Sequence, residues 1–370
     1  MTTHTKRVRG GGGRTRKTVA AVVATMAVIL TAGCSGSSST GAAEGSPAAA
    51  EGSPAAAEGS PAAAELTPVN DQLGWLKITQ FGGFFNADAN GYYKDEGIAP
   101  TFTAGGPNIS GWQSVSSGKA QIGDDDNTNV LLAIEKGEPL VVIGAIFQTS
   151  PFAIISRADN PIKTIQDVKG KTIALPEAAK QQVEALITAA GISLDDVELV
   201  PAGPDPSALA SGQVDGYFGY ATAQGVALQA QGIDVETLYL EDMGVPSYGN
   251  VIITTKDELA KNKDLLVRYM RASIKGYEYL NANPDAGAKV VVDSYGPPDL
   301  VLANEQLTAK FQADLIKSDK GVLNVDPTKM QKIIDALVAA GTLSGPLSAA
   351  DVVDTSVLEE AYSGQTTLLK

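Results

Sequence analysis

Histidine and cysteine, which often carry nucleophilic or zinc chemistry, are almost absent from this chain of 370 residues. The sequence contains one histidine, His4, and one cysteine, Cys34. A Ser-His-Asp triad or a histidine-based zinc site cannot be built from this inventory, and no Gly-x-x-x-x-Gly-Lys-Ser/Thr loop is present to hold ATP. We therefore expect that the protein is not an enzyme and that it binds no cofactor and no metal ion. Catalysis by carboxylates alone, as in glycosidases, stays open.

Carboxylates, amides and aromatic rings are the remaining groups that could bind a ligand. Asp124, Asp125 and Asp126 stand in a row, and Phe84 and Phe85 precede an amide. Rings stack on flat aromatic molecules, and aspartate accepts hydrogen bonds from exocyclic amines, as it does from cytosine. The pattern favours a neutral or cationic nitrogen heterocycle. Nucleic acid is not expected as a partner of a chain with a net charge of −14.

These residues must be positioned by an α/β fold, because short β-type runs alternate with amphipathic segments. Helices are expected at 127–136, 177–190, 257–282, 304–318, 326–340 and 348–363. Strands are expected at 75–81, 98–103, 120–123, 140–147, 152–156, 172–175, 197–200, 214–220, 236–240 and 251–255. In doubly wound sheets ligands lie outside the carboxyl ends of strands, so the segments after these runs are the candidate site.

The predicted ligand contacts come from those segments. They are Phe84, Phe85, Asn86, Asn108, Ser110, Asp124, Asp125, Asp126, Gln148, Thr149, Glu177, Tyr217, Tyr220, Tyr248 and Asn250. One phenylalanine of the pair, and one of Tyr217 and Tyr220, is expected in the core, as are both tryptophans, Trp75 and Trp112. An aspartate could instead cap a helix. The segments contain no Lys, Arg or His, although amides at a helix start could still bind an anion.

The first 34 residues have the features of a secretory signal with a lipidation site. Six cations precede an apolar run at 19–30, and Thr31-Ala32-Gly33-Cys34 follows. The run is short for a membrane crossing of about 20 residues, although a transmembrane anchor stays open. We expect a signal peptide at 1–33, lipidation of Cys34, and an exported protein anchored to the outer face of the cytoplasmic membrane.

A repetitive segment separates this signal from the rest. Glu-Gly-Ser-Pro-Ala-Ala-Ala occurs three times in tandem at 44–64, in a stretch of Ser, Gly, Ala, Pro and Glu. No large apolar side chain is available for burial there, so the sequence predicts a disordered tether at 34–70.

Several segments of the remaining chain read as motifs. They are 91–98 (GYYKDEGI), 117–123 (SGKAQIG), 131–142 (LLAIEKGEPLVV), 165–173 (IQDVKGKTI), 244–248 (GVPSY) and 275–284 (KGYEYLNANP). In this order they resemble the nitrate, sulfonate and thiamine-precursor class of periplasmic binding proteins, in which the first two motifs read GYFKDEGL and SGKADFG. Residues 244–248 and 275–284 are most similar to the thiamine-pyrimidine-precursor branch.

The resemblance implies a type II periplasmic-binding-protein fold, with two doubly wound lobes, a hinge and a cleft. It implies one lobe at 71–148 plus 250–370 and another at 149–249. It further implies a monomeric receptor of an ABC permease and its ATPase, which captures a thiamine-pyrimidine precursor or a flavin-like molecule by lobe closure.

Three alternatives stay open. The ligand could be a sulfonate such as taurine, or nitrate, and the receptor could serve a membrane sensor instead of an importer. A pyrimidine-synthase-like enzyme is the third alternative. The resemblance ties that enzyme to a histidine-bearing active site and a cysteine-rich motif, which this chain lacks.

Overall fold

The computed structural model describes residues 65–106, 109–345 and 347–369. The predicted signal peptide, Cys34 and most of the predicted tether lie outside these residues. None of the helices in the described ranges is long and apolar enough to cross a membrane.

The predicted tether ends too late, and the first predicted strand is wrong. The first strand is β1 (Thr67–Gln72), inside the segment assigned to the tether. Its sequence, TPVNDQ, has few of the β-branched or aromatic residues that mark strands. Residues 75–81, which alternate like a strand, instead form a loop and a single 3₁₀ turn at Thr79–Phe81.

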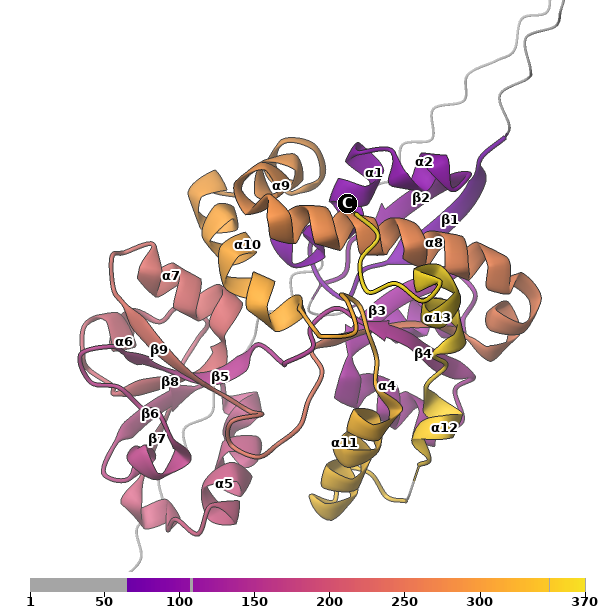
Figure 1. The fold of residues 1–370 in the computed structure, drawn as a ribbon. Helices are drawn as coiled ribbons and strands as arrows, with labels where there is room; N and C mark the ends of the chain where they lie inside the picture. The colour runs from indigo at the N-terminus through magenta and orange to yellow at the C-terminus, as the bar shows by residue number, and fades with distance from the viewer. Residues whose placement is uncertain (1–64, 107–108, 346, 370) are drawn as a thin grey trace, which may run out of the picture. The chain divides into compact units, whose positions relative to one another are not determined.

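Two five-stranded sheets carry the fold (Figure 1). The first has the order β2-β1-β3-β10-β4, with β1 parallel to β2 and β3, and β10 antiparallel to β3 and β4. Its other strands are β2 (Ile98–Thr103), β3 (Ile122–Asp126), β4 (Leu140–Ala145) and β10 (Asn250–Thr255).

The second sheet repeats the pattern in the order β7-β6-β8-β5-β9, with β6 parallel to β7 and β8, and β5 antiparallel to β8 and β9. Its strands are β5 (Phe152–Arg157), β6 (Thr172–Leu175), β7 (Glu198–Pro201), β8 (Gly216–Tyr220) and β9 (Val235–Tyr239). In each sheet the antiparallel strand is the one that the chain enters after leaving the other sheet. The predicted α/β class is confirmed, whereas the lobe boundaries at 148/149 and 249/250 stay a prediction.

Helices fill the connections and the C-terminal part. They are α1 (Gly82–Ala89), α2 (Tyr92–Asp95), α3 (Gly111–Ser116), α4 (Asn127–Glu135), α5 (Lys180–Ala189), α6 (Ser207–Ala210), α7 (Val226–Gln229), α8 (Lys256–Ala282), α9 (Pro284–Val290), α10 (Leu302–Ile316), α11 (Pro327–Ala339), α12 (Ala349–Val352) and α13 (Ser356–Tyr362). The single helix predicted at 348–363 is split into α12 and α13, because Val353 between them is extended and bridges to Val142 of β4.

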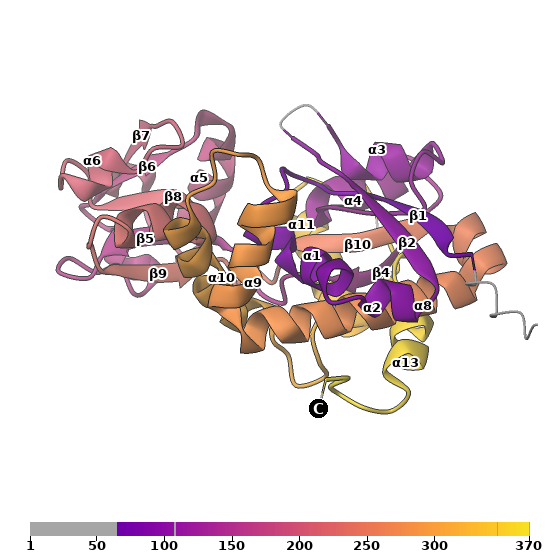
Figure 2. The same cartoon turned by 90° about the horizontal axis from the view of Figure 1, so that it is seen from above.

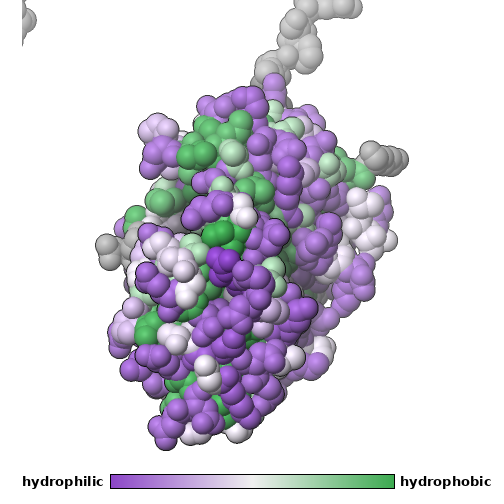
Figure 3. Space-filling view, turned by 90° about the vertical axis from the view of Figure 1, so that its left-hand side faces the viewer, coloured by the Kyte–Doolittle hydropathy of each residue, from purple (hydrophilic) through white to green (hydrophobic). Residues whose placement is uncertain are grey.

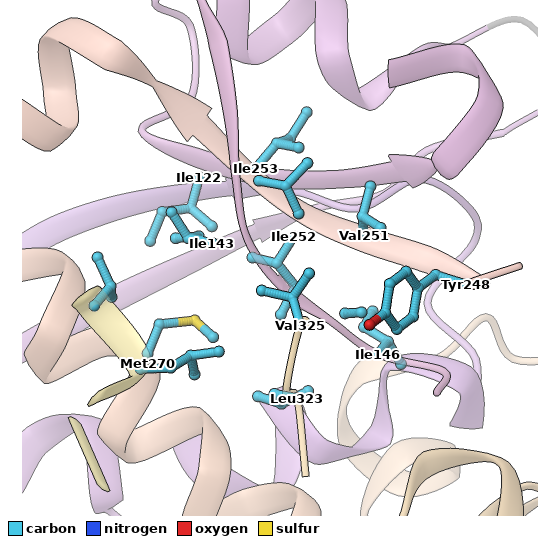
Figure 4. Packing of buried hydrophobic residues seen from close by; sticks show 14 of the residues in the cluster. Ile122, Ile143, Ile146, Tyr248, Val251, Ile252, Ile253, Met270, Leu323 and Val325 are labelled. Atoms are coloured by element: carbon cyan, nitrogen blue, oxygen red, sulfur yellow. The ribbon is translucent and has the colours of Figure 1, made fainter. Parts of the chain in front are cut away.

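The core of the first sheet is built around β10. Val251, Ile252 and Ile253 form an unbroken apolar run because this strand lies between β3 and β4, as expected for a strand that is covered on both faces. Figure 4 shows Met270 of α8 and Leu323 among the side chains that surround this run.

Helices α1 and α8 lie against each other (Figure 2). Gly83 of α1 faces the ring of Tyr277, and Gly276 of α8 faces the carbonyl oxygen of Gly83. A methyl group at either glycine would overlap these atoms, so the two backbones approach as closely as glycine permits.

The face of the molecule on the side of the second sheet is covered mainly by hydrophilic residues, with hydrophobic ones in small groups (Figure 3). Such a surface suits contact with water.

Candidate functional site

A cleft of about 850 Å³ lies outside the carboxyl ends of β1, β3 and β8, where this type of sheet places its ligands. Both sheets contribute to it. The lining residues are Gly74, Trp75, Ile78, Gln80, Gly106, Ile109, Ser110, Gln113, Asp125, Asp126, Asn129, Tyr220, Thr222, Ala223, Gln224, Val226, Ala227, Asn250, Asn304, Glu305 and Thr308.

The three aspartates were predicted to follow a strand. They instead form the last three residues of β3. Asp124 is only 1% exposed. Its carboxylate accepts hydrogen bonds from Nδ2 of Asn250 at 2.6 Å and from the amide of Gly74 at 3.1 Å. Asp124 therefore holds two residues of the lining in place and does not itself line the cleft. Burial, followed by the nearby carboxyl of Asp71, raises the pKa of Asp124 well above its ordinary value.

Asp125 and Asp126 do line the cleft. Asp125 accepts hydrogen bonds from the amide of Asp126 at 2.8 Å and from Nδ2 of Asn129 at 3.2 Å. Asp126 caps α4, since its Oδ1 accepts the amide of Thr128 at 2.8 Å. Burial raises the pKa of Asp126. The predicted alternative that an aspartate caps a helix is therefore correct for Asp126, which also lines the cleft.

Tyr220 is the aromatic residue that the second sheet contributes. It ends β8, and its ring meets that of Phe152 edge-on with centroids 4.4 Å apart. Burial, and then the three aspartates, raise the pKa of Tyr220, so its hydroxyl stays protonated. A π-helical turn at Ala221–Gly225 follows directly, a feature that is frequent at functional sites.

Two of the lining residues that the sequence did not predict as contacts carry chemistry of their own, Trp75 and Glu305. Trp75 was expected in the core but is 39% exposed and lines the cleft. Glu305 of α10 lines it as well, and its Oε2 accepts the amide of Thr79 at 2.9 Å. Nothing near Glu305 in the sequence signals this role, because the residue is brought to the cleft by the packing of a helix more than 200 residues downstream of β1.

The lining is negatively charged. Among the lining residues that the structure describes, Asp125, Asp126 and Glu305 are carboxylates, and none is Lys, Arg or His. An anion would find no cationic side chain there, whereas N–H groups would find carboxylate and amide acceptors.

Of the predicted contacts, the structure brings five together in the cleft. They are Ser110, Asp125, Asp126, Tyr220 and Asn250. Asn108 lies outside the described residues, and Glu177 is exposed away from the lining.

Phe84, Phe85, Asn86 and Tyr217 are buried instead. The segment after the first 3₁₀ turn folds as α1, whose side chains pack inward, so both phenylalanines enter the core rather than one of them. Phe84 meets Tyr277 edge-on at 5.2 Å, and the hydroxyl of Tyr217 donates to the carbonyl of Gly203 at 2.6 Å.

Gln148, Thr149 and Tyr248 also lie elsewhere, in the segments that connect the two sheets. The amide of Gln148 donates to the carbonyl of Asn324 at 2.8 Å, and the hydroxyl of Thr149 donates to Glu241 at 2.9 Å. These side chains are engaged by the protein itself and do not line the cleft.

Two such sheets with a cleft between them define the class of periplasmic binding proteins. The alkanesulfonate-binding protein SsuA from Xanthomonas axonopodis pv. citri, bound to MOPS, has a TM-score of 0.55 at 17% identity, covering 79% of this chain and all of that one. The aliphatic sulphonate-binding SsuA from Escherichia coli has a TM-score of 0.58 at 14% identity, covering 80% and 99%. The predicted periplasmic-binding-protein fold is confirmed.

Within this class, the chain belongs to the family described as NMT1/THI5 like, which matches residues 78–287. It is 27% identical over 289 residues to the riboflavin-binding protein RibY of Chloroflexus aurantiacus, covering 74% of this chain and 81% of RibY. It is 23% identical over 291 residues to a formylaminopyrimidine-binding protein of Halalkalibacterium halodurans, covering 76% and 88%. A 4-amino-5-hydroxymethyl-2-methylpyrimidine phosphate synthase of Schizosaccharomyces pombe is 27% identical over 201 residues, 51% of this chain and 58% of the synthase. The predicted family is confirmed.

Proposed function

We propose that this protein is the extracytoplasmic solute-binding receptor of an ABC importer and that its cleft captures a small nitrogen heterocycle. The observation that carries the proposal is the composition of the lining. Carboxylates and amides lie beside Trp75 and Tyr220 there, and none of the described lining residues has a cationic side chain. Two relatives are named for ligands of this chemistry, riboflavin and formylaminopyrimidine.

Each group in the lining has a matching part in such a ligand. Asp125, Asp126 and Asn250 accept hydrogen bonds from ring or exocyclic N–H groups. The two aromatic residues come from opposite sheets, Trp75 after β1 and Tyr220 at the end of β8. A flat ring between them contacts both lobes, so binding favours closure over the ligand. The volume of about 850 Å³ falls in the range of about 300 to 1,000 Å³ that is usual for small-molecule sites.

A binding role is favoured over catalysis. Residues 65–369 contain neither histidine nor cysteine, so the synthase relatives do not carry their activity over to this chain. Lipidation at Cys34, export, a monomeric state and a permease with its ATPase are parts of the same proposal. A sensor with the same receptor is the second candidate, and it requires a partner kinase instead of a permease.

The test is a ligand screen on the chain without its first 34 residues. Thermal unfolding is measured with 4-amino-5-hydroxymethyl-2-methylpyrimidine, formylaminopyrimidine, thiamine, riboflavin, taurine, MOPS and nitrate. A ligand at 100 times its Kd adds about 2.7 kcal/mol to the free energy of unfolding. We expect at least one heterocycle to raise the unfolding temperature, and we expect this rise to be smaller in the Asp125→Asn variant. A shift with the sulfonates or nitrate alone would contradict the proposal.

A further inference from the structure

Glu305 is a third carboxylate in the cleft, separate in sequence and in fold from the aspartates of β3. It lies in the first turn of α10 and is 9% exposed. Its Oε2 accepts the amide of Thr79, and its Oε1 has no hydrogen-bond partner within the described ranges. Because Glu305 is part of the lining, this free oxygen is available to a molecule in the cleft.

A chain of contacts connects Glu305 with Asp126 along one wall of the cleft. Asn250 stands opposite Asp126 in the β3–β10 pairing, and its Oδ1 accepts a hydrogen bond from Nε2 of Gln80 at 2.8 Å. Thr79, the neighbour of Gln80, is the residue bonded to Glu305. The wall therefore presents a carboxylate, two amides and a second carboxylate in order.

The position of Glu305 is fixed by contacts of α10 with both parts of the molecule. The hydroxyl of Thr308, one turn further along α10, lies 3.5 Å from the carbonyl of Thr222 on the side of the second sheet. Phe311 packs on the core of the second sheet, and Gln312 donates to the carbonyl of Thr79 at 2.9 Å. These contacts of α10 position Glu305 at the cleft.

The carboxylate of Glu305 is not neutralised by the protein. None of the ion pairs in the described part of the chain includes Glu305, Asp125 or Asp126. A positively charged N–H group of a ligand would supply the cation that the described residues do not place there.

We infer that Glu305 is a specificity-determining residue that selects heterocycles with a cationic amine placed beside its free Oε1. The inference rests on the proposed function and adds the charge of the ligand to it. A hydrogen bond between two charged groups is roughly twice as strong as one between neutral groups. A hydroxyl at the same place donates a weaker bond, and a sulfonate there is repelled.

Two pyrimidines that differ in one group test the inference. They are 4-amino-5-aminomethyl-2-methylpyrimidine, as its ammonium form, and 4-amino-5-hydroxymethyl-2-methylpyrimidine, and their Kd values are measured by calorimetry at pH 6.5. We expect the native sequence to bind the ammonium form at least about tenfold more tightly, which corresponds to about 1.4 kcal/mol. Glu305→Gln should remove this preference, because the glutamine amide carries no charge to attract the ammonium group.

Glu278→Gln is the matched control, because Glu278 also accepts backbone amides, those of Leu368 and Leu369, outside the cleft. It should keep the preference. A native protein without the preference, or a preference that survives Glu305→Gln and disappears in Asp125→Asn, would overturn the inference. If Glu305→Gln does not fold, Glu305→Asp replaces it, and its shorter side chain should reduce the preference.

Failure of the proposed function gives a different result. The native protein would then bind neither pyrimidine, nor thiamine, nor riboflavin. Binding of either pyrimidine without discrimination between them leaves the proposed function standing and removes only the role of Glu305.

Discussion

The ammonium of Lys329 in α11 lies 2.9 Å from the carboxylate of Glu241, which follows β9. The same ammonium donates to the carbonyl of Gln148 at 2.6 Å and lies 5.0 Å from the ring centroid of Tyr248. Gln148 precedes the second sheet and Tyr248 follows it. One cation from the C-terminal part therefore joins both segments that connect the two sheets, where Gln148, Thr149 and Tyr248 had been expected to contact a ligand.

We expect this ion pair to contribute to stability more than an ordinary surface pair. The side chains are 20% and 39% exposed, so screening by water is incomplete. A double-mutant cycle with Lys329→Met and Glu241→Gln should give a coupling energy of about 1 kcal/mol in urea unfolding. The control cycle on Lys261 and Asp257, which are 68% and 72% exposed, should give about 0.3 kcal/mol. Equal coupling energies in the two cycles would show that the Lys329–Glu241 pair contributes no more to stability than an ordinary surface pair.

Phe84 and Trp75 should respond in opposite ways to truncation. Phe84 is buried among Phe102, Tyr269 and Tyr277, so Phe84→Ala should lower the free energy of unfolding by about 3 to 5 kcal/mol. Trp75→Ala should leave stability within about 1 kcal/mol and weaken heterocycle binding about tenfold, because stacking on a ring contributes about 1 to 3 kcal/mol. Urea unfolding and calorimetry measure the two effects. If the Phe84→Ala variant stayed stable but lost affinity for the ligand, Phe84 would have to be a ligand contact and not a core residue.

The contact between α1 and α8 predicts a severe effect of one methyl group. Gly276→Ala would place that group on the carbonyl of Gly83, and the backbone cannot yield cheaply. We expect a loss of about 3 kcal/mol or more, or no folded protein, from this overlap. Gly203→Ala is the control, since its added methyl group would meet open space. It should change the unfolding midpoint little, and a similar loss in both variants would mean that helix packing is not the cause.

The strands could be predicted because apolar runs between glycine and proline signals are local properties. The strands at 98–103 and 172–175 have the predicted bounds, and Gly191 has the positive φ expected just beyond α5. Strand β1 could not be predicted in this way, because its central position depends on pairing with β2 and β3. Its polar Asp71 and Gln72 are buried by the rest of the fold.

The cleft could be predicted only in part for the same reason. Asp125 and Asp126 end β3, and Ser110 follows β2, where a rule based on sheet topology finds them. Asn250 begins β10 and reaches the same edge because β10 pairs antiparallel with β3. Whether Phe84 or Trp75 faces the cleft depends on where α1 begins. Glu305 depends on the packing of α10.

The carboxyl of Asp71 makes a pH-dependent contribution that can be measured. It is 1% exposed and accepts the hydroxyl of Tyr269, while its Oδ1 has no hydrogen-bond partner in the described residues. Burial raises the pKa of Asp71 and the hydrogen bond from Tyr269 lowers it by a smaller amount, which together leave the pKa at about 6. Other titratable groups near it in the described residues are the phenols of Tyr93 and Tyr277 and the carboxyl of Asp124, and none of them supplies a positive charge.

Between pH 4 and pH 6 the folded protein therefore keeps a proton on Asp71 that the unfolded chain has lost. The free energy of unfolding must then fall as the pH rises through this window and level off above it, by about 3 kcal/mol for a shift from 3.8 to about 6. The side chain in Asp71→Asn cannot ionise. Between pH 4 and pH 7 the free energy of unfolding of this variant should therefore decline by about 3 kcal/mol less than that of the native protein. Asp88→Asn is the control, because Asp88 also accepts a tyrosine hydroxyl, from Tyr295, but is not fully buried. The free energy of unfolding is measured by chemical denaturation at pH 4, 5, 6 and 7. If its dependence on pH were the same for the native protein and for Asp71→Asn, Asp71 would be ionised throughout this range.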